Sequence, residues 1–303
     1  MNAVLSDTDA FVTWRSAQQA AVERALERWV PSDAPAGLGD AMRYAVLDGG
    51  KRLRPLLVLA TCEAVGGHRE AALRAACAVE LIHAYSLVHD DMPCMDNDVL
   101  RRGKPTVHVR FGQAQALLAG DALQALAFEL LVPGDGSVGD AMSARLCRLL
   151  ALSAGADGMA GGQAVDLASV GVALDLASLE AMHRRKTGAL LQASVVMGAA
   201  TGTPSHDVQA LLARYGASLG LAFQVVDDIL DVTADSATLG KTAGKDAAAD
   251  KPTFVSLMGL AAAQAYADRV LDQAHDALRR SGLDHSHAHT LHALADWVGR
   301  RVS

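Results

Sequence analysis

Two clusters of aspartates lie far apart in the sequence, and apolar residues surround each of them. They are residues 90–96, DDMPCMD, and residues 227–231, DDILD. Carboxylates packed this closely repel one another and are costly to bury unless cations compensate them. Their hard oxygens suit Mg²⁺, which keeps part of its water shell and completes its coordination with substrate phosphates. The two clusters therefore predict a site for a metal-bridged diphosphate.

Cationic residues flank both clusters. Lys51 and Arg54 stand three apart after two glycines, so a helix that begins there would present both on one side and could bind an anion at its N-terminus. The other cationic motifs are residues 101–102 (RR) after the first cluster, residues 183–188 (HRRKTG), and residues 241–246 (KTAGKD) after the second cluster. On a helix, His183, Lys186 and Thr187 would share one face. Cations around two acidic clusters match the needs of bound diphosphates.

Helices are predicted to carry these residues. Residues 220–226 (GLAFQVV) are apolar and continue into the second cluster, so Asp227 and Asp231 should lie four apart on one helical face. The apolar residues 79–89 predict a helix before the first cluster, which Pro93 must distort before Asp96 is reached. Turn signals occur at residues 49–50, 66–67, 133–134, 161–162, 202–204 and 281–282. The predicted fold class is all-α, a single large helical bundle around a central active-site cavity.

The composition favours one helical domain over residues 1–303. The chain is 51% hydrophobic but only 4% aromatic, which suits closely packed helices around one large core. The net charge of -7 argues against nucleic acid as a partner. The longest apolar stretches, such as residues 189–202, fall short of the ~20 residues that span a bilayer, so no stable membrane span is expected.

The cysteines and the N-terminus bear on the compartment. Four cysteines, at positions 62, 77, 94 and 147, show no Cys-x-x-Cys spacing. The acidic N-terminus has no basic region ahead of an apolar one, so it does not resemble a signal peptide. Reduced thiols and a cytoplasmic location are therefore expected.

The order of these motifs resembles that of the trans-prenyl diphosphate synthase family, and it is most similar to the bacterial farnesyl diphosphate synthases. The resemblance runs from about residue 41 to about residue 260. Besides the motifs above, it includes residues 49–55 (GGKRLRP), 120–121 (GD), 161–166 (GGQAVD), 223–224 (FQ) and 251–253 (KPT). No single motif is specific to the family, but the ordered set is.

The resemblance implies a role for each matched residue. The diphosphate of isopentenyl diphosphate would be held by Lys51, Arg54, His83 and Arg102. The allylic diphosphate would be held by Arg101, Lys186, Thr187, Gln224 and Lys241. The metal ligands would be Asp90, Asp96, Asp227 and Asp231, and the catalytic set would be Asp90, Asp91, Asp96, Asp227, Asp228 and Lys186. Mg²⁺ is the implied cofactor, with Mn²⁺ as a substitute, and the implied assembly is a homodimer that takes isoprenoid diphosphates.

The implied reaction needs no protein nucleophile. Neutralisation of the leaving diphosphate lets the allylic carbon ionise, and the double bond of isopentenyl diphosphate attacks that carbon. A proton is then lost, with the departed diphosphate as the implied base. Water must be excluded because it would quench the cation, and Phe223 is a candidate ring to face that cation.

Tyr85 and Ser86 are the candidate residues for the floor of the hydrocarbon tunnel. Tyr85 precedes Asp90 by five residues, which is about 7.5 Å along a helix. An aromatic ring here resembles bacterial enzymes that stop at fifteen carbons, so the predicted product is farnesyl diphosphate, made from dimethylallyl and geranyl diphosphates. The frame DMPCMDND with RRGKPT also resembles plant-type geranylgeranyl diphosphate synthases, which leaves geranylgeranyl or geranyl synthesis as the alternative.

Two other classes of protein fit less of the sequence. A class I terpene cyclase also ionises diphosphates with magnesium, but it would not need Lys51 and Arg54 for a second diphosphate. A non-catalytic partner subunit of the same fold usually loses one aspartate cluster, and both are intact here. Near the C-terminus, Arg300 and Arg301 are expected to face solvent. The histidines at 285, 287, 289 and 292 are expected to form a solvated helix start rather than a metal site.

Overall fold

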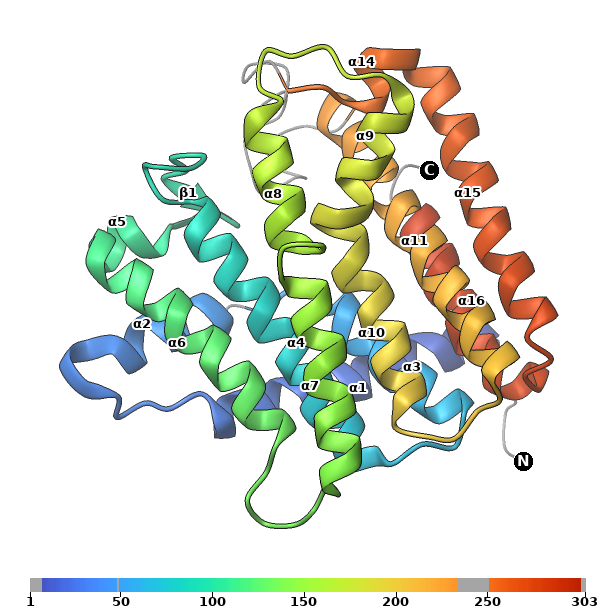
Figure 1. Ribbon diagram of the computed structural model, residues 1–303, viewed down its shortest axis with the longest axis horizontal. Helices are drawn as coiled ribbons and strands as arrows, with labels where there is room; N and C mark the ends of the chain where they lie inside the picture. Colours follow the sequence, from blue (N-terminus) through green and yellow to red (C-terminus); the bar gives the residue numbers. More distant parts are fainter. Residues whose placement is uncertain (1–6, 48, 234–250, 301–303) are drawn as a thin grey trace.

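Helices make up nearly all the regular structure in the computed structural model, which describes residues 7–47, 49–233 and 251–300 (Figure 1). The first half contains α1 (Asp7–Trp29), the 3-10 turn η1 (Pro35–Gly37), α2 (Leu38–Val46), α3 (Leu53–Ala64), α4 (Arg69–Asp90), α5 (Val107–Phe111), α6 (Gln113–Leu131) and α7 (Asp140–Ala154). The second half contains α8 (Met159–Ala168), α9 (Leu176–His183), the π-helical turn η2 (Arg184–Gly188), α10 (Ala189–Ala200), α11 (His206–Thr233), α14 (Phe254–Met258), α15 (Leu260–Arg280) and α16 (His285–Gly299). Among the described residues the only strands are β1 (Leu100–Arg101) and β2 (Lys104–Pro105), which pair antiparallel. The predicted all-α fold is confirmed.

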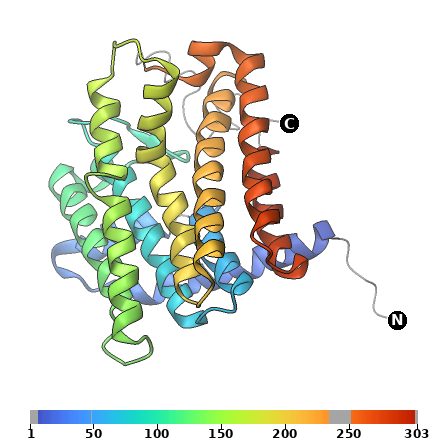
Figure 2. The ribbon, with the colours of Figure 1, turned by 45° about the vertical axis from the view of Figure 1, so that its right-hand side comes forward.

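The helix α4 runs through the interior of the bundle. Its apolar residues Val79, Leu81 and Ile82 have no exposed area, and α3, α6 and α10 pack against it. A second apolar cluster forms where α11 packs between α10 and α15. The two views show these long helices standing side by side (Figures 1 and 2). Because α4 and α11 end toward the same end of the bundle, the fold brings the two aspartate clusters together there.

Local chemistry explains where the helices near the clusters begin and end. The helix α4 stops at Asp90, ahead of Pro93, as the sequence predicted, because proline has no backbone N–H to continue it. The helix α3 begins only at Leu53, so Lys51 lies in the preceding loop and the expected helical face of Lys51 and Arg54 is wrong. The residue between these two, Arg52, has a left-handed backbone (φ 49°) that ends the loop.

The turn predicted at residues 161–162 is also wrong, because both glycines lie within α8. A Cβ atom at Gly162 would stand 2.1 Å from the backbone nitrogen of Lys186. The glycine is therefore required for the close approach of α8 to η2 rather than for a change of chain direction.

Two helices in the described part of the chain are long and apolar enough to cross a membrane by length and composition, Arg69–Asp90 and Gln113–Leu131. The sequence analysis expected no such segment. Length and composition alone are weak evidence, since a core helix meets the same criteria, and 72% of the apolar window of α4 is buried inside the protein.

Candidate active site

A cavity of about 450 Å³ lies between α3, α4, α11 and α16, and we call it the α3–α11 cavity. All four residues predicted to hold isopentenyl diphosphate line it: Lys51, Arg54, His83 and Arg102. Asp227, Phe223 and Leu230 of α11 complete the wall on one side, and Trp297 and Val298 of α16 on another. Residues from five separate segments of the sequence thus meet around one cavity.

Burial lowers the pKa of two basic groups in the α3–α11 cavity, Arg54 and His83. The Nε atom of Arg54 is buried and has no hydrogen-bond partner among the described residues, and burial lowers the pKa of this side chain. Burial, followed by the charges of Arg54 and Arg102, lowers the pKa of His83 well below its ordinary value. The cavity therefore combines arginines with a neutral imidazole. The positive charge of the arginines favours an anionic ligand.

Arg102 is held at the rim of the same cavity by two glycines. Its Nη1 donates to the carbonyl oxygen of Gly49 at 2.6 Å. Its guanidinium also lies against Gly50, where a Cβ atom would stand 2.9 Å from Nη1. Gly50 thus makes room for an arginine that follows the first aspartate cluster, and Gly49 supplies its acceptor from 53 residues earlier in the chain.

A second cavity, of about 360 Å³, lies between α4 and α8, and we call it the α4–α8 cavity. Arg54 and His83 line both cavities, so the two are adjacent. The other lining residues include Asp90, Lys186 and Thr187 at the polar end, and Tyr85, Ser86, His89, Met95, Met159, Gln163 and Leu167. A polar group and an apolar tail of one ligand could therefore be held together here.

The first aspartate cluster follows the end of α4. The backbone N–H of Asp96 donates to the carbonyl oxygen of Asp90 at 2.8 Å, which folds the loop back toward the helix end. Burial raises the pKa of Asp90 to about 6, and the neighbouring Asp96 adds to that rise while Lys186 opposes it. Asp91 instead points away into a bidentate pair with Arg101, whose Nε lies 3.0 and 2.9 Å from the two carboxylate oxygens. The cluster therefore favours cations, and Asp90 is its member that lines the α4–α8 cavity.

Lys251 joins this cluster to α8, and the sequence analysis assigned it no role. Its Nζ lies 3.1 Å from Asp96 Oδ1 and 3.3 Å from Asp166 Oδ2. Lys186 Nζ lies 2.6 Å from the same oxygen of Asp166. Burial opposes ionisation of Asp166, but the two ammonium groups hold its pKa below the ordinary value. Asp166 and Lys251 belong to the sequence motifs at residues 161–166 and 251–253, but only the fold shows that the two side chains meet.

The second aspartate cluster divides into residues with different surroundings. Asp227 lines the α3–α11 cavity, and Asp231 is buried one turn later in α11. Asp228 is only 2% exposed, and its oxygens accept hydrogen bonds from Gln224 Nε2 at 2.8 Å and from the backbone N–H of Phe254 at 2.9 Å. Protein donors therefore occupy this carboxylate, and the catalytic role expected for Asp228 stays a prediction.

The π-helical turn η2 presents Lys186 and Thr187 to the α4–α8 cavity. Such turns are frequent at functional sites. Thr187 Oγ1 donates to Gln224 Oε1 at 2.9 Å, so the pair Gln224 and Asp228 also fixes this hydroxyl. His183 was expected on the same helical face as Lys186 and Thr187, but it lies elsewhere. It ends α9 and packs against the Phe254 ring at 5.6 Å.

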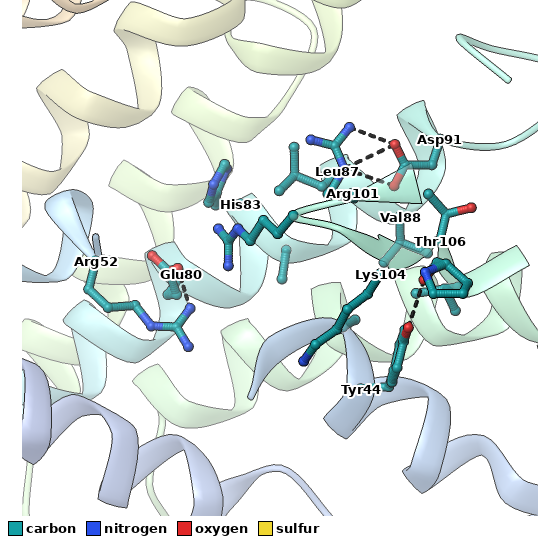
Figure 3. Close-up of a pocket in the computed structure, with 15 residues that line it drawn as sticks. Tyr44, Arg52, Glu80, His83, Leu87, Val88, Asp91, Arg101, Lys104 and Thr106 are labelled. Atoms are coloured by element: carbon teal, nitrogen blue, oxygen red, sulfur yellow. Dashed lines mark hydrogen bonds and ion pairs between the residues drawn. The ribbon is translucent and has the colours of Figure 1, made fainter. Parts of the chain in front are cut away.

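The remaining predicted residues are placed differently. Arg101 lines a smaller cavity with Tyr44, Glu80 and Lys104 (Figure 3), and Gln224 acts on the α4–α8 cavity through Thr187. Lys241 and Arg301 lie outside the described residues. Arg300 is exposed at the end of α16. Within the described residues, no group of three histidines, cysteines or carboxylates is placed to hold a metal ion alone.

The helix α16 closes the α3–α11 cavity, which the sequence analysis did not foresee. Trp297 lines the cavity, and the guanidinium carbon of Arg15 in α1 lies 5.0 Å from its ring centre. A cation over an aromatic ring stabilises such a contact. The first and last helices are thereby joined at the wall of the site.

Comparison with known proteins places this geometry in a family. The polyprenyl synthetase family model matches residues 35–287. A heterodimeric geranylgeranyl pyrophosphate synthase large subunit from Arabidopsis thaliana is 48% identical, with 92% of this chain and 76% of that protein covered. An FPP/GFPP synthase structure from Zymomonas mobilis has a TM-score of 0.84 at 42% identity and covers 96% of this chain and 99% of its own. A Helicobacter pylori geranyltransferase complexed with magnesium and isoprenyl diphosphate has a TM-score of 0.86 at 32% identity and covers 99% and 100%.

The comparisons correct the cytoplasmic location expected from the sequence. The Arabidopsis relative and further plant relatives of 46–47% identity are chloroplastic proteins. The cytoplasmic prediction is therefore wrong by this comparison. It rested on the lack of a secretory signal pattern and on cysteine spacing, and neither property distinguishes one reducing compartment from another.

The family model, the relatives and the solved structures agree with the family that the order of motifs resembles. They support a prenyltransferase and not the terpene cyclase considered from the sequence. The chain belongs to the polyprenyl synthetase family, whose matched members here are trans-prenyl diphosphate synthases.

Proposed function

We propose that this protein condenses isopentenyl diphosphate with allylic diphosphates and releases geranylgeranyl diphosphate as its main product. The observation that carries the proposal is the pair of adjoining cavities that share Arg54 and His83. One cavity gathers cations around a neutral imidazole, and the other leads from Asp90 and Lys186 into largely apolar space. The geranylgeranyl product is supported by several plant synthases of that name, which are 45–48% identical to this chain.

The α3–α11 cavity is the proposed site of isopentenyl diphosphate. Lys51, Arg54 and Arg102 would bind its diphosphate, and the neutral His83 would donate one hydrogen bond without adding charge. Phe223 and Trp297 would cover the hydrocarbon part and keep water from the reacting carbons. Asp227 on the same wall faces the junction of the two substrates.

The α4–α8 cavity is the proposed site of the allylic substrate. Lys186 and Thr187 would bind its diphosphate, with Lys251, Arg101, Gln224 and Lys241 as supporting residues. These cations stabilise the charge that develops on the leaving diphosphate, which is the largest electrostatic demand of the ionisation. The double bond of isopentenyl diphosphate would then attack the allylic carbon, and the departed diphosphate would take the proton that the condensed cation loses to give the product.

The residues of the two clusters fit a divalent cation. Burial together with Asp96 raises the pKa of Asp90 to about 6, so an added positive charge would stabilise its ionised form. Lys251 already places an ammonium group against Asp96. Asp90, Asp96, Asp227 and Asp231 are the proposed ligands of Mg²⁺, which Mn²⁺ could replace. When bound, the ion would neutralise the leaving diphosphate as a Lewis acid.

Farnesyl diphosphate is the second candidate product, and one observation favours it. The Tyr85 ring lines the α4–α8 cavity five residues before Asp90, and Ser86 lies beside it. The ring is 8% exposed and packs edge to face against His89 at 5.7 Å. A ring in this place would stop a growing chain earlier than a flexible side chain would. Whether the chain bends past Tyr85 or stops there decides between twenty and fifteen carbons.

The test is a timed incubation of the purified protein with labelled isopentenyl diphosphate, dimethylallyl diphosphate and Mg²⁺, followed by chromatographic sizing of the dephosphorylated products. We expect the fifteen-carbon species to appear early and the twenty-carbon species to accumulate. A product that stops at fifteen carbons with isopentenyl diphosphate still present would establish the farnesyl candidate. No condensation with either allylic substrate would overturn the proposed function.

We also propose that residues 1–303 act as one catalytic domain and that two copies form a homodimer. The proposed partners are small isoprenoid diphosphates, without nucleic acid. Light scattering of the purified protein tests the dimer directly, since a monomer mass at micromolar concentration would contradict it.

A further inference from the structure

Arg52 is buried at the centre of the loop that carries the proposed isopentenyl diphosphate cations. Its Nε and Nη2 donate to Glu23 of α1 at 2.7 and 3.1 Å. Its Nη1 donates to Glu80 of α4 at 2.7 Å, and its Nη2 also donates to the carbonyl oxygen of Val46 at the end of α2. One side chain thus joins α1, α2 and α4 to the start of α3.

Arg52 lines the α3–α11 cavity, but these contacts engage its guanidinium, whereas the Nε of Arg54 has no hydrogen-bond partner among the described residues. An arginine has five N–H donors, and these four hydrogen bonds engage all three nitrogens of the Arg52 guanidinium. The residue is only 5% exposed, in contrast to the partly exposed Lys51 and Arg54 on either side. Its left-handed backbone is uncommon for a residue with a side chain, and such a conformation persists where the surroundings over-determine it.

The position of Arg52 fixes the directions of its neighbours. A left-handed residue between Lys51 and Arg54 turns the chain, so that Lys51 projects from the loop and Arg54 from the first turn of α3. Both nonetheless reach the same cavity. The turn depends on the Arg52 side chain, because nothing else in the described loop makes as many contacts with three other helices.

Glu80 supplies the opposite charge for this group. It is 4% exposed, lies one turn before His83 on α4, and is drawn beside that ring in Figure 3. Burial lowers the pKa of Arg54 and Arg102, and the charge of Glu80 opposes that fall. For Arg52, Glu23 and Glu80 together outweigh burial, so its pKa is raised. A buried ion pair contributes little net stability compared with apolar residues of the same volume. A role in arranging the cations therefore explains this one better than a role in stability.

We infer that Arg52, with Glu23 and Glu80, is a positioning network for the isopentenyl diphosphate site. The inference rests on the proposed function of the α3–α11 cavity. The network holds Lys51 and Arg54 in register before substrate arrives, and Glu80 compensates the cluster of arginines while no diphosphate is present. Arg52 itself touches no substrate, so its loss acts through the placement of its neighbours.

The first test compares Arg52→Met and Arg52→Lys with the wild type in steady-state assays of both substrates. We expect Arg52→Met to raise KM for isopentenyl diphosphate by about tenfold or more, while KM for the allylic substrate stays within about twofold. Arg52→Lys keeps the charge but loses the planar fork, so it should recover only part of the loss. Equal changes in both KM values, or an unchanged KM for isopentenyl diphosphate, would overturn the inference.

Arg74→Met is the matched control for a merely structural effect. Arg74 is also a shielded arginine, paired with Glu70 at 2.9 Å and Asp135 at 3.3 Å, and its guanidinium carbon lies 5.0 Å from the Trp29 ring centre. It lines neither the α3–α11 nor the α4–α8 cavity. We expect a lower Tm with both KM values unchanged. A rise in KM for isopentenyl diphosphate here, equal to that of Arg52→Met at equal loss of Tm, would contradict a specific role for Arg52.

The second test needs no turnover and uses Glu80→Gln with inorganic pyrophosphate as the probe. Without Glu80 the arginines repel one another, so Tm should fall and pyrophosphate should raise it by more than in the wild type. An equal or smaller rise would overturn the compensating role of Glu80. If Glu80→Gln does not fold, the half-exposed Glu23→Gln takes its place, with a raised KM for isopentenyl diphosphate as the expected result and an unchanged KM as the contrary one.

Different results would refute the proposed function and the positioning network. A wild type that binds pyrophosphate but condenses nothing would refute the proposed function, while the pyrophosphate shifts would still test the network. A wild type that condenses isopentenyl diphosphate, with Arg52 variants of normal KM, would refute the network alone.

Discussion

If the Tyr85 ring stops the growing chain, as the farnesyl candidate requires, its replacement by alanine should lengthen the product by at least one five-carbon unit. The ring lines the α4–α8 cavity, and its removal opens space toward the N-terminal part of α4. Leu81 and Ile82, both fully buried, are the next side chains along that part of the helix. They lie three and four residues earlier, so the floor should drop by about 4.5–6 Å. That distance is close to the extended length of one isoprene unit.

The stability cost of this change can be bounded. Truncating a fully enclosed ring costs about 3–5 kcal/mol through the cavity that it leaves. Since Tyr85 borders an existing cavity on one side, we expect about 2–3 kcal/mol. The variant should therefore fold, with a lower Tm.

The assay is chromatographic sizing of products from matched amounts of wild type, Tyr85→Ala and Tyr85→Phe. Tyr85→Phe removes the hydroxyl but keeps the ring, so its product distribution should match that of the wild type. Urea denaturation and circular dichroism establish that each variant is folded. A folded, active Tyr85→Ala enzyme with the wild-type distribution would refute the assignment of the floor to this ring.

Four further predictions concern the clusters, the cofactor and pH. Asp227→Ala should cut kcat by orders of magnitude with little change in Tm. Asp228→Ala leaves two hydrogen-bond donors without an acceptor, so it should lower the free energy of unfolding by about 1–3 kcal/mol in urea titrations. Lys251→Met should lower kcat/KM for the allylic substrate by about tenfold or more and leave KM for isopentenyl diphosphate unchanged. Excess chelator should abolish turnover, and added Mg²⁺ or Mn²⁺ should restore it; full activity in chelator would refute the metal site. Burial lowers the pKa of His183 to about 4, so this residue takes up a proton on unfolding below about pH 6.5. Its contribution should make the free energy of unfolding about 2–3 kcal/mol lower at pH 4.5 than at pH 7. The variant His183→Phe should remove that part of the pH dependence.

The helices and both aspartate clusters could be predicted because their signals are local. Apolar periodicity before Asp90 and around Asp227 is a property of neighbouring residues, and a proline sets one helix end. The resemblance to a family added the partners of each cluster. All four residues that it implied for isopentenyl diphosphate lie in one cavity, although the sequence alone placed Lys51 wrongly on a helix.

Contacts between distant segments could not be read from the sequence. Lys251 meets Asp166 across 85 residues, and Trp297 reaches a cavity whose other walls come from the first 230 residues. Neither contact leaves a periodic pattern. The glycines at 161 and 162 were misread because glycine marks both turns and close helix packing, and only the approach of α8 to η2 distinguishes the two uses.

The two halves of the site differ in what compensates their cations. On the allylic side, Lys186 and Lys251 are paired with Asp166 and Asp96, and a divalent ion at Asp96 would have to displace Lys251. Released from Asp96, that ammonium group becomes available to the diphosphate that arrives with the ion. On the other side, Arg52 and Glu80 hold the cations through a network that includes neither aspartate cluster. We therefore expect isopentenyl diphosphate to bind without the metal and the metal to be needed for ionisation of the allylic substrate, and binding of each substrate in chelator would test this.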